Sequence, residues 1–236
     1  MGVKKYRNNF KFTEQPQDLN LPLTWKKPKK VFVNSMSDLF HENARMEYIG
    51  ICFNTMLKAN HHTYQVLTKR PDTMADFSIM FKNYFGDIIP PHIWMGTSVE
   101  NEEFKWRIDA LRQVECHTRF LSIEPLLGPI EKLNLSNIDW VIIGGESGAH
   151  FRPVKKEWII DIVKQCKKQK VAVFFKQWGG FRPKSGGREL DGKTYDQYPK
   201  TKYVENVLNE VVYDESEFAK FSKQKIKQKK SAILEI

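Results

Sequence analysis

The sequence predicts an α/β protein, and two observations lead to this fold class. First, six short apolar runs recur along the chain with starts about 20 to 33 residues apart, which suits one strand followed by one crossover helix. Second, these runs are almost continuously apolar rather than alternating, as is typical of parallel strands covered on both faces. Two architectures fit this pattern, an open doubly wound sheet and a complete or partial barrel.

Each expected strand coincides with one apolar run, and most gaps between the runs carry a helical pattern. The strands are expected at VFVN (31–34), YQVLT (64–68), IWMGT (93–97), RFLSI (119–123), WVIIG (140–144) and VAVFFK (171–176). Amphipathic helices are expected over 42–60, 71–85, 101–114 and 154–169, where apolar residues recur at helical spacing. The second helix begins with Pro71, a residue favoured in the first helical turn.

The chain divides into three parts by composition. Residues 1–30 form an N-terminal extension that ends in the basic run WKKPKK, and residues 31–199 form the βα domain. Residues 200–236 form a C-terminal segment with a lysine-rich tail. The net charge of +10 is compatible with an anionic partner such as nucleic acid, but a solvated lysine-rich tail is the favoured interpretation of the excess.

The apolar runs and the cysteines indicate the compartment. No run approaches the ~18 apolar residues that a bilayer span requires, and the N-terminus lacks the apolar stretch of a signal peptide. The three cysteines, Cys52, Cys116 and Cys166, lie far apart and show no metal-ligand spacing. We therefore expect a cytoplasmic protein with reduced thiols, no bound metal and no membrane association.

Polar and ionisable residues follow every expected strand. Ligands bind at the carboxyl ends of parallel strands in both architectures, so we expect these residues to form one polar ligand pocket. Its carboxylates come from four strand ends, and cations from two others can balance them. The expected pocket comprises Asn34, Ser35, Ser37, Asp38, Lys69, Arg70, Thr97, Ser98, Glu100, Glu124, Gly144, Gly145, Glu146, Lys176 and Gln177.

One of these strand ends, DWVIIGGESG (139–148), combines glycines with a carboxylate. It has neither the GxGxxG spacing of a dinucleotide-binding loop nor the GK[ST] ending of a phosphate-binding loop. Its glycines would let the backbone approach a ligand closely. Glu146 would repel a phosphate but could bind an amine or a ribose hydroxyl, which favours an amino-acid or nucleoside moiety.

Several motifs, taken in order, resemble a bacteriophage-associated family of unknown function named after phage gene products thirty-seven and sixty-eight. They are VFVNSMSDLFH, QVLTKRP, IWMGTSVEN, RFLSIEPLLGPI, WVIIGGESG and FFKQWGG, followed by LDG, and the match extends from about residue 6 to residue 199. Members of this family resemble radical S-adenosylmethionine enzymes, which are built on full or partial βα barrels. The resemblance therefore implies a partial, TIM-like barrel of about six parallel strands with S-adenosylmethionine at the strand ends.

The same resemblance implies roles for the pocket residues. S-adenosylmethionine would be bound by the group Asn34, Ser35, Ser37, Asp38, Thr97, Ser98, Glu100, Glu124, Gly144, Gly145 and Glu146. An anionic substrate would be held by Lys69, Arg70, Lys176 and Gln177. Family members carry three close-spaced N-terminal cysteines like those that ligate an iron–sulfur cluster, and the cysteines of this chain match none of those positions. We therefore expect no cluster in this chain, unless a second protein supplies the missing cysteine-bearing segment.

Two other kinds of function fit parts of the sequence. A non-catalytic binding module for nucleic acid, or for a phage or host protein, would use the basic tail and the WKKPKK run. A metal-free hydrolase would use the clustered carboxylates, but the chain shows no nucleophile-elbow motif and no histidine-base pattern.

Overall fold

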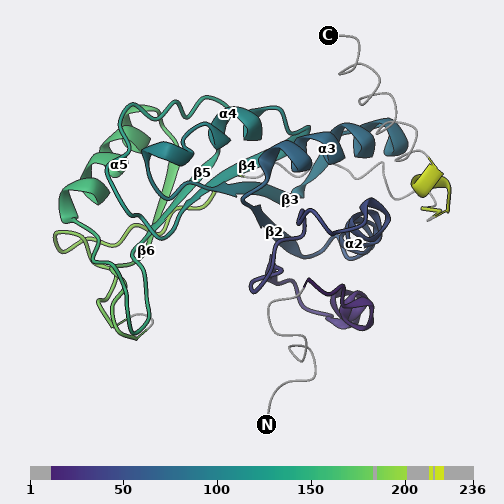
Figure 1. Cartoon of the computed structure of the whole chain (residues 1–236), viewed down its shortest axis with the longest axis horizontal. Helices are drawn as coiled ribbons and strands as arrows, with labels where there is room; N and C mark the ends of the chain where they lie inside the picture. Colours follow the sequence, from purple (N-terminus) through teal and green to yellow (C-terminus); the bar gives the residue numbers. More distant parts are fainter. Residues whose placement is uncertain (1–11, 183–184, 201–212, 215, 221–236) are drawn as a thin grey trace.

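Six parallel strands form an open half-barrel in the computed structural model, which describes residues 12–182, 185–200, 213–214 and 216–220 (Figure 1). The strands are β1 (Lys30–Val33), β2 (Thr63–Thr68), β3 (Ile89–Ser98), β4 (Cys116–Ile123), β5 (Trp140–Gly144) and β6 (Ala172–Gln177). Each strand pairs with the next one along the chain, in the order β1-β2-β3-β4-β5-β6. A doubly wound sheet reverses its strand order at a switch point, so this sequential order confirms the partial barrel and excludes the open sheet.

Helices connect most of the strands and cover one face of the sheet. They are α2 (Met46–Lys58), α3 (Pro71–Phe85), α4 (Arg107–Arg112) and α5 (Lys156–Lys168). Figure 1 shows α3, α4 and α5 along the same side of the strands, as right-handed crossovers require. The helix expected over 101–114 is shorter than predicted, because the chain first makes the 3₁₀ turn η3 (Glu102–Phe104) before α4 begins.

Local sequence signals explain where the longest helix begins and ends. Pro71 opens α3 because its fixed φ suits the first turn and its missing N–H has no helical partner there. Gly86 closes the helix in a left-handed conformation, with φ 82°, and its N–H donates to the Lys82 carbonyl. Between these signals Phe77 and Phe81 turn inward and are fully buried, so the amphipathic pattern positions the helix on the sheet.

The connection from β4 to β5 contains no helix, and two glutamines of α5 satisfy its backbone instead. Gln165 accepts a hydrogen bond from Leu133 N at 2.6 Å and donates to Ile130 O at 2.9 Å. Gln169 accepts from Leu135 N at 2.9 Å. Buried backbone groups need such partners, so these amides replace the crossover helix in fixing this loop.

The two faces of the sheet carry separate apolar clusters because side chains alternate along each strand. The convex face joins the strands to the helices and includes a group of phenylalanines, among which Phe53 and Phe77 have ring centroids 4.6 Å apart. The concave face holds a smaller cluster of Trp94, Phe120, Trp140 and Ile142. This concave cluster is the floor beneath the carboxyl ends of the strands.

The segment after β6 returns along the sheet and closes part of the concave face. Phe175 N donates to Tyr195 O at 3.0 Å, and Trp140 Nε1 donates to Gln197 O at 2.8 Å. Tyr198 then stacks against Trp140, with ring centroids 5.2 Å apart. The outer edge of β6 is therefore covered, whereas β1 pairs only with β2 among the described strands.

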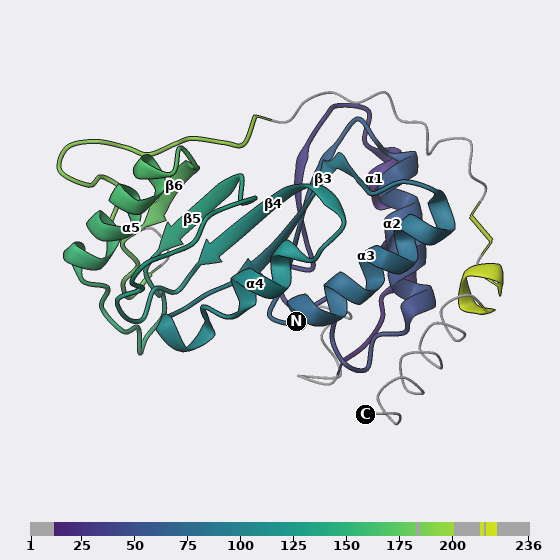
Figure 2. The ribbon, with the colours of Figure 1, turned by 90° about the horizontal axis from the view of Figure 1, so that it is seen from above.

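The N-terminal segment, with the 3₁₀ turn η2 (Pro16–Asp18) and the short helix α1 (Leu21–Thr24), packs beside α2 (Figure 2). His62 fastens this segment to the barrel, since its Nδ1 accepts from Lys29 N at 3.2 Å and its Nε2 lies 3.0 Å from Pro22 O. Both bonds form together only when the ring is neutral and carries its hydrogen on Nε2. The described part of the predicted extension thus contacts the barrel directly.

Most of the predicted lysine-rich tail lies outside the described residues. Within those residues, no helix has both the length and the apolar character that crossing a bilayer requires.

Candidate functional site at the carboxyl rim

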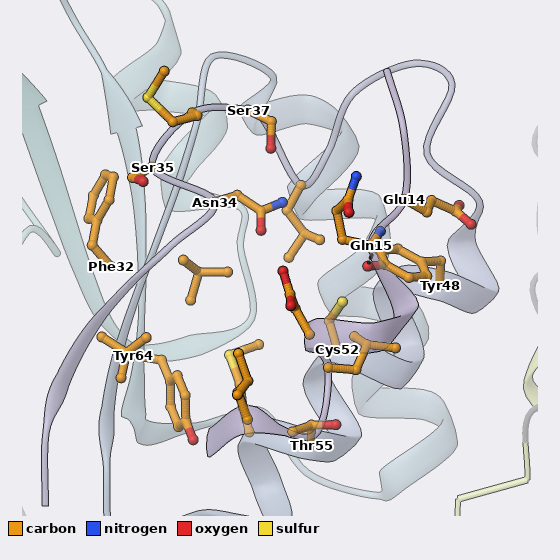
Figure 3. Close-up of a pocket in the computed structure, with 18 of the residues that line it drawn as sticks. Glu14, Gln15, Phe32, Asn34, Ser35, Ser37, Tyr48, Cys52, Thr55 and Tyr64 are labelled. Carbon is orange, nitrogen blue, oxygen red and sulfur yellow. Dashed lines mark hydrogen bonds between the residues drawn. The ribbon is translucent and has the colours of Figure 1, made fainter. Parts of the chain in front are cut away.

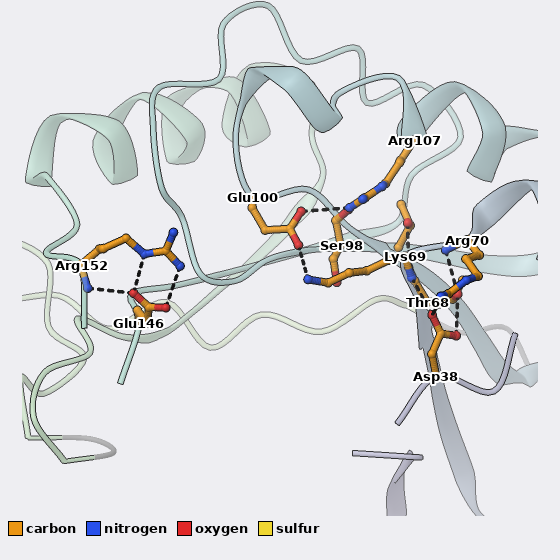
Figure 4. Close-up of polar contacts among 10 residues, drawn as sticks. Asp38, Thr68, Lys69, Arg70, Ser98, Glu100, Arg107, Glu146 and Arg152 are labelled. Atoms are coloured by element: carbon orange, nitrogen blue, oxygen red, sulfur yellow. Dashed lines mark hydrogen bonds and ion pairs between the residues drawn. The ribbon is translucent and has the colours of Figure 1, made fainter. Parts of the chain in front are cut away.

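Glu100, just after β3, is the most buried carboxylate of the carboxyl rim. It is 5% exposed, and both of its oxygens are paired with cations (Figure 4). Lys69 Nζ lies 2.6 Å from Oε1, and Arg107 Nη1 lies 3.0 Å from Oε2. Arg107 also donates to the Ser98 carbonyl at 3.0 Å. Two cations thus surround one carboxylate, which leaves a local excess of positive charge.

Asp38, in the loop after β1, ties that loop to the start of α3. Its Oδ1 accepts from Thr68 Oγ1 at 2.7 Å and from Phe40 N at 2.9 Å. Its Oδ2 accepts from Arg70 Nη1 at 2.9 Å and from Lys69 N at 3.2 Å. Because four donors bind this carboxylate, Asp38 has a structural role and holds the loop after β1 against the rim.

Glu124, just after β4, is held more loosely than the other two carboxylates. Its nearest cation is Lys176, at 3.3 Å from Oε1, and Ser122 Oγ lies 3.3 Å from Oε2. Burial raises the pKa of Glu124 above its usual value, and Lys176 and Ser122 offset only part of that effect. A buried carboxylate with long, incomplete contacts has capacity for a further donor or cation.

Glu146, after β5, forms a two-point ion pair that the sequence did not reveal. Arg152 Nε and Nη2 donate to its two oxygens at 2.8 and 2.7 Å, and Arg152 N adds a third bond at 2.8 Å. These hydrogen bonds lower the pKa of Glu146 to about 2. Figure 4 shows this pair apart from the Glu100 group, so an amine would have to displace Arg152 to reach Glu146.

The glycines of the GGESG stretch make room for the chain itself. A Cβ on Gly144 would lie 3.2 Å from Cγ of Glu124 and still closer to its carboxylate. A Cβ on Gly145 would overlap the Trp178 carbonyl. Gly145 N donates to Gln177 O at 2.9 Å, and the Gln177 amide donates back to Gly145 O at 3.2 Å. The space that was predicted for a ligand beside these glycines is therefore occupied by Glu124 and by Gln177 and Trp178 at the end of β6.

The fifteen residues predicted for one pocket lie in three neighbouring groups, and the hydrogen bonds from Lys69 and Arg70 to Asp38 join the first two. The first group surrounds a cavity beside β1 and consists of Asn34, Ser35, Ser37 and Asp38. The second follows β2 and β3 and consists of Lys69, Arg70, Thr97, Ser98 and Glu100. The third follows β4, β5 and β6 and consists of Glu124, Gly144, Gly145, Glu146, Lys176 and Gln177. Within the second group, Thr97 is fully buried and donates to the Thr68 carbonyl at 2.8 Å, so its hydroxyl is already used.

The three cysteines lie on separate elements: Cys52 on α2, Cys116 at the start of β4 and Cys166 on α5. Burial raises the pKa of each thiol to about 12. Iron–sulfur ligation needs several thiolates close together, so these residues do not fit such a cluster. No group of three potential metal ligands occurs in the part of the chain that the structure describes.

The protein is an α/β half-barrel in which ion pairs lie at the carboxyl ends of the parallel strands. A family model described as "Protein of unknown function (DUF5131)" matches residues 1–199. The chain therefore belongs to this family, and the resemblance seen in the motifs is confirmed at the level of an uncharacterised family. Comparison with curated proteins and with solved structures gave no match.

Proposed function

We propose that the rim around Glu124 binds S-adenosylmethionine, and that the protein is a phage-related relative of radical S-adenosylmethionine enzymes. The observation that carries the proposal is the loosely held carboxylate of Glu124, which has only Lys176 and Ser122 as partners at 3.3 Å or more. The ordered motifs described above support the family part of the proposal.

The chemistry of the rim suits the polar groups of this cofactor. Glu124 can accept hydrogen bonds from the α-amino group or the ribose hydroxyls, and Lys176 can pair with the carboxylate. The buried aromatic residues Trp94, Phe120 and Trp140 pack beneath these groups and support the rim. When bound, S-adenosylmethionine supplies an activated carbon on its sulfonium. The protein's own part is to bind and orient the molecule, and the three cysteines give no ligand set for a cluster.

Calorimetric titration with S-adenosylmethionine tests the proposal. We expect heat of binding from the wild-type protein and at least tenfold weaker binding by Glu124→Gln, which removes a charged hydrogen-bond acceptor. Glu115→Gln is a matched control, because Glu115 precedes β4 at its opposite end and is partly exposed. Absence of heat at millimolar cofactor, or equal binding by Glu124→Gln, would refute the site.

A nucleic-acid role is a second candidate, favoured by lysines that lie over aromatic rings near β1. Lys29 Nζ is 4.3 Å from the Trp25 ring centroid, and Lys30 Nζ is 3.4 Å from that of Tyr198. Lysine and aromatic side chains together form the kind of surface that single strands contact. A gel shift at low salt with single-stranded oligonucleotides tests this role, and retardation should disappear at high salt. No retardation at low salt would exclude it.

A further inference from the structure

The outer edge of β1 has no strand beside it in the part of the chain that the structure describes. The opposite edge of the sheet is covered, because the segment after β6 bonds to that strand. The N-terminal segment packs beside α2 and leaves a cavity of about 470 Å³ against β1 (Figure 3). An open edge presents backbone N–H and C=O groups with which another strand can pair. A further strand can therefore extend the half-barrel at β1.

The pairing with β2 decides which backbone groups of β1 face outward. In a parallel pair, alternate residues of a strand direct both their N–H and their C=O to the neighbouring strand. Thr63 N donates to Lys29 O at 2.8 Å, so the other odd-numbered residues of β1 also bond to β2. Lys30 and Phe32 therefore direct their backbone groups away from β2, and no residue that the structure describes bonds to those groups.

Exposed apolar side chains gather around this edge. Leu21 is 46% exposed, Phe32 44% and Met36 77%, and all three border the cavity. Large apolar side chains that lie together at a surface mark contacts with other molecules. A lysine can protect an open edge against pairing, but the ammonium of Lys30 lies 3.4 Å from the ring centroid of Tyr198. Tyr198 packs on the concave face, so the charge of Lys30 is held there.

We propose that two copies of the protein pair through β1, with the two strands antiparallel about a two-fold axis beside Val31. Lys30 of one protomer then lies opposite Phe32 of its partner, and the two residues exchange both backbone hydrogen bonds. Every outward-facing backbone group of Lys30 and Phe32 thereby gains a partner. The two Val31 side chains lie opposite each other as an apolar, β-branched pair. The interface is isologous, and the two half-barrels form one continuous sheet.

The charges near the two ends of β1 favour a second copy in this orientation. Exposed lysines precede the strand, at Lys26, Lys27 and Lys29. The described lining of the cavity, at and beyond the other end of the strand, contains no Lys or Arg but three carboxylates, those of Glu14, Asp18 and Asp38. Arginines outside the lining pair with two of these carboxylates, so this end is close to neutral. Antiparallel pairing places the lysines of each protomer beside the end of its partner that has none, and like charges do not face each other.

Light scattering coupled to size-exclusion chromatography tests the proposal on the full chain. We expect twice the mass of one chain at tens to hundreds of micromolar, and dissociation on dilution. The mass of a single chain throughout this range would overturn the proposal. Glu124→Gln should leave the dimer unchanged, so this outcome is independent of the rim proposal.

A proline at position 32 isolates the backbone hydrogen bond. Proline is tolerated on an edge strand where the N–H that it removes faces outward, so Phe32→Pro should keep the fold, which circular dichroism checks. Phe32→Val is the matched control, because it removes the same aromatic ring but keeps the N–H. We expect dimerisation of Phe32→Pro to be at least tenfold weaker than that of Phe32→Val, since each dimer loses two hydrogen bonds. Equal dimerisation by the two variants would contradict the proposal.

Amide hydrogen exchange in the wild-type protein gives a second measurement that needs no substitution. The amides of Lys30 and Phe32 should exchange more slowly as the concentration rises through the dissociation range. Those of Val31 and Val33 should be protected at every concentration, because they bond to β2. A dimer in which the Lys30 and Phe32 amides exchange equally fast at low and high concentration would use another surface and would overturn the proposal.

Discussion

Replacing Gly96 by alanine tests the packing of the concave face. Gly96 lies in β3, and a Cβ there would stand 2.5 and 2.6 Å from Cε1 and Cε2 of Phe120. Phe120 is fully buried, and its ring centroid is 5.7 Å from that of Trp140, so it cannot yield without displacing its neighbour. Overpacking of this kind costs about 1–3 kcal/mol. Alanine also reduces the freedom of the unfolded chain, which returns about 0.4–1 kcal/mol. We therefore expect a net loss of about 1–2 kcal/mol in the free energy of unfolding.

Urea unfolding followed by circular dichroism measures this loss. Gly128→Ala is the control, because its added Cβ would meet nothing closer than Asn101 Cβ at 3.7 Å. The control should be unchanged or up to about 1 kcal/mol more stable. Adding Phe120→Leu to Gly96→Ala should recover about 1 kcal/mol through a favourable coupling between the two positions. If Gly96→Ala were as stable as Gly128→Ala, the close packing of β3 against Phe120 would be refuted.

Three further predictions concern single side chains. Burial raises the pKa of Glu124 above 4.5, so its ionisation opposes folding. The free energy of unfolding of the wild type should therefore fall relative to that of Glu124→Gln as the pH rises from about 4 to about 7. Denaturation curves recorded across this pH range measure the difference between the two proteins, and a difference that stays constant would contradict the prediction. Arg152→Gln should return the pKa of Glu146 from about 2 towards 4.5. It should also remove the stabilisation that the ion pair gives above pH 4.5 and that is lost as the pH falls. Carbon NMR titration of the Glu146 carboxyl measures the pKa, and an unchanged pKa would refute the ion pair. His62→Ala should destabilise the protein by about 1–2 kcal/mol, because Lys29 N loses its partner and Pro22 O keeps only the Trp25 N–H as a donor. Thermal unfolding checks this, and a loss under about 0.5 kcal/mol would count against it.

The fold class and the strands could be predicted because the apolar pattern of each strand is local. The central strands β3 and β5 are almost wholly buried, as their continuous apolar runs predict, whereas burial alternates along β1 and β2. The choice between barrel and doubly wound sheet could not be made from periodicity alone, since both share the βα repeat. It depends on strand order, which long-range packing decides. The prediction of a single helix over 101–114 was wrong at its start. The chain first makes the 3₁₀ turn η3, and α4 begins only at Arg107, whose side chain pairs with Glu100.

The candidate site could be predicted only as a set of residue types at strand ends. Which carboxylates remain available depends on partners that the sequence does not mark as such. Arg107 and Arg152 were missed for this reason, although each lies only six or seven residues beyond the carboxylate that it pairs with. The glycines at the end of β5 were expected to let the backbone approach a ligand, whereas the group that approaches Gly145 in the structure is the Trp178 carbonyl.

The cavity beside β1 had no signal in the sequence. It arises where the N-terminal segment packs against β1 and α2, and neither element alone encloses it. Asn34 was singled out only because it follows a strand. Its unpaired amide and its left-handed backbone became visible with the structure.

The central claim is that a ligand binds at the rim around Glu124. Amide NMR spectra recorded during a titration with S-adenosylmethionine test it most directly. The account predicts that the largest shifts will be those of Ser122, Gly144 and Gln177, which surround Glu124 and Lys176, and that Glu124→Gln will abolish them. Unchanged spectra at millimolar cofactor, or shifts confined to residues away from the ends of β4, β5 and β6, would contradict it.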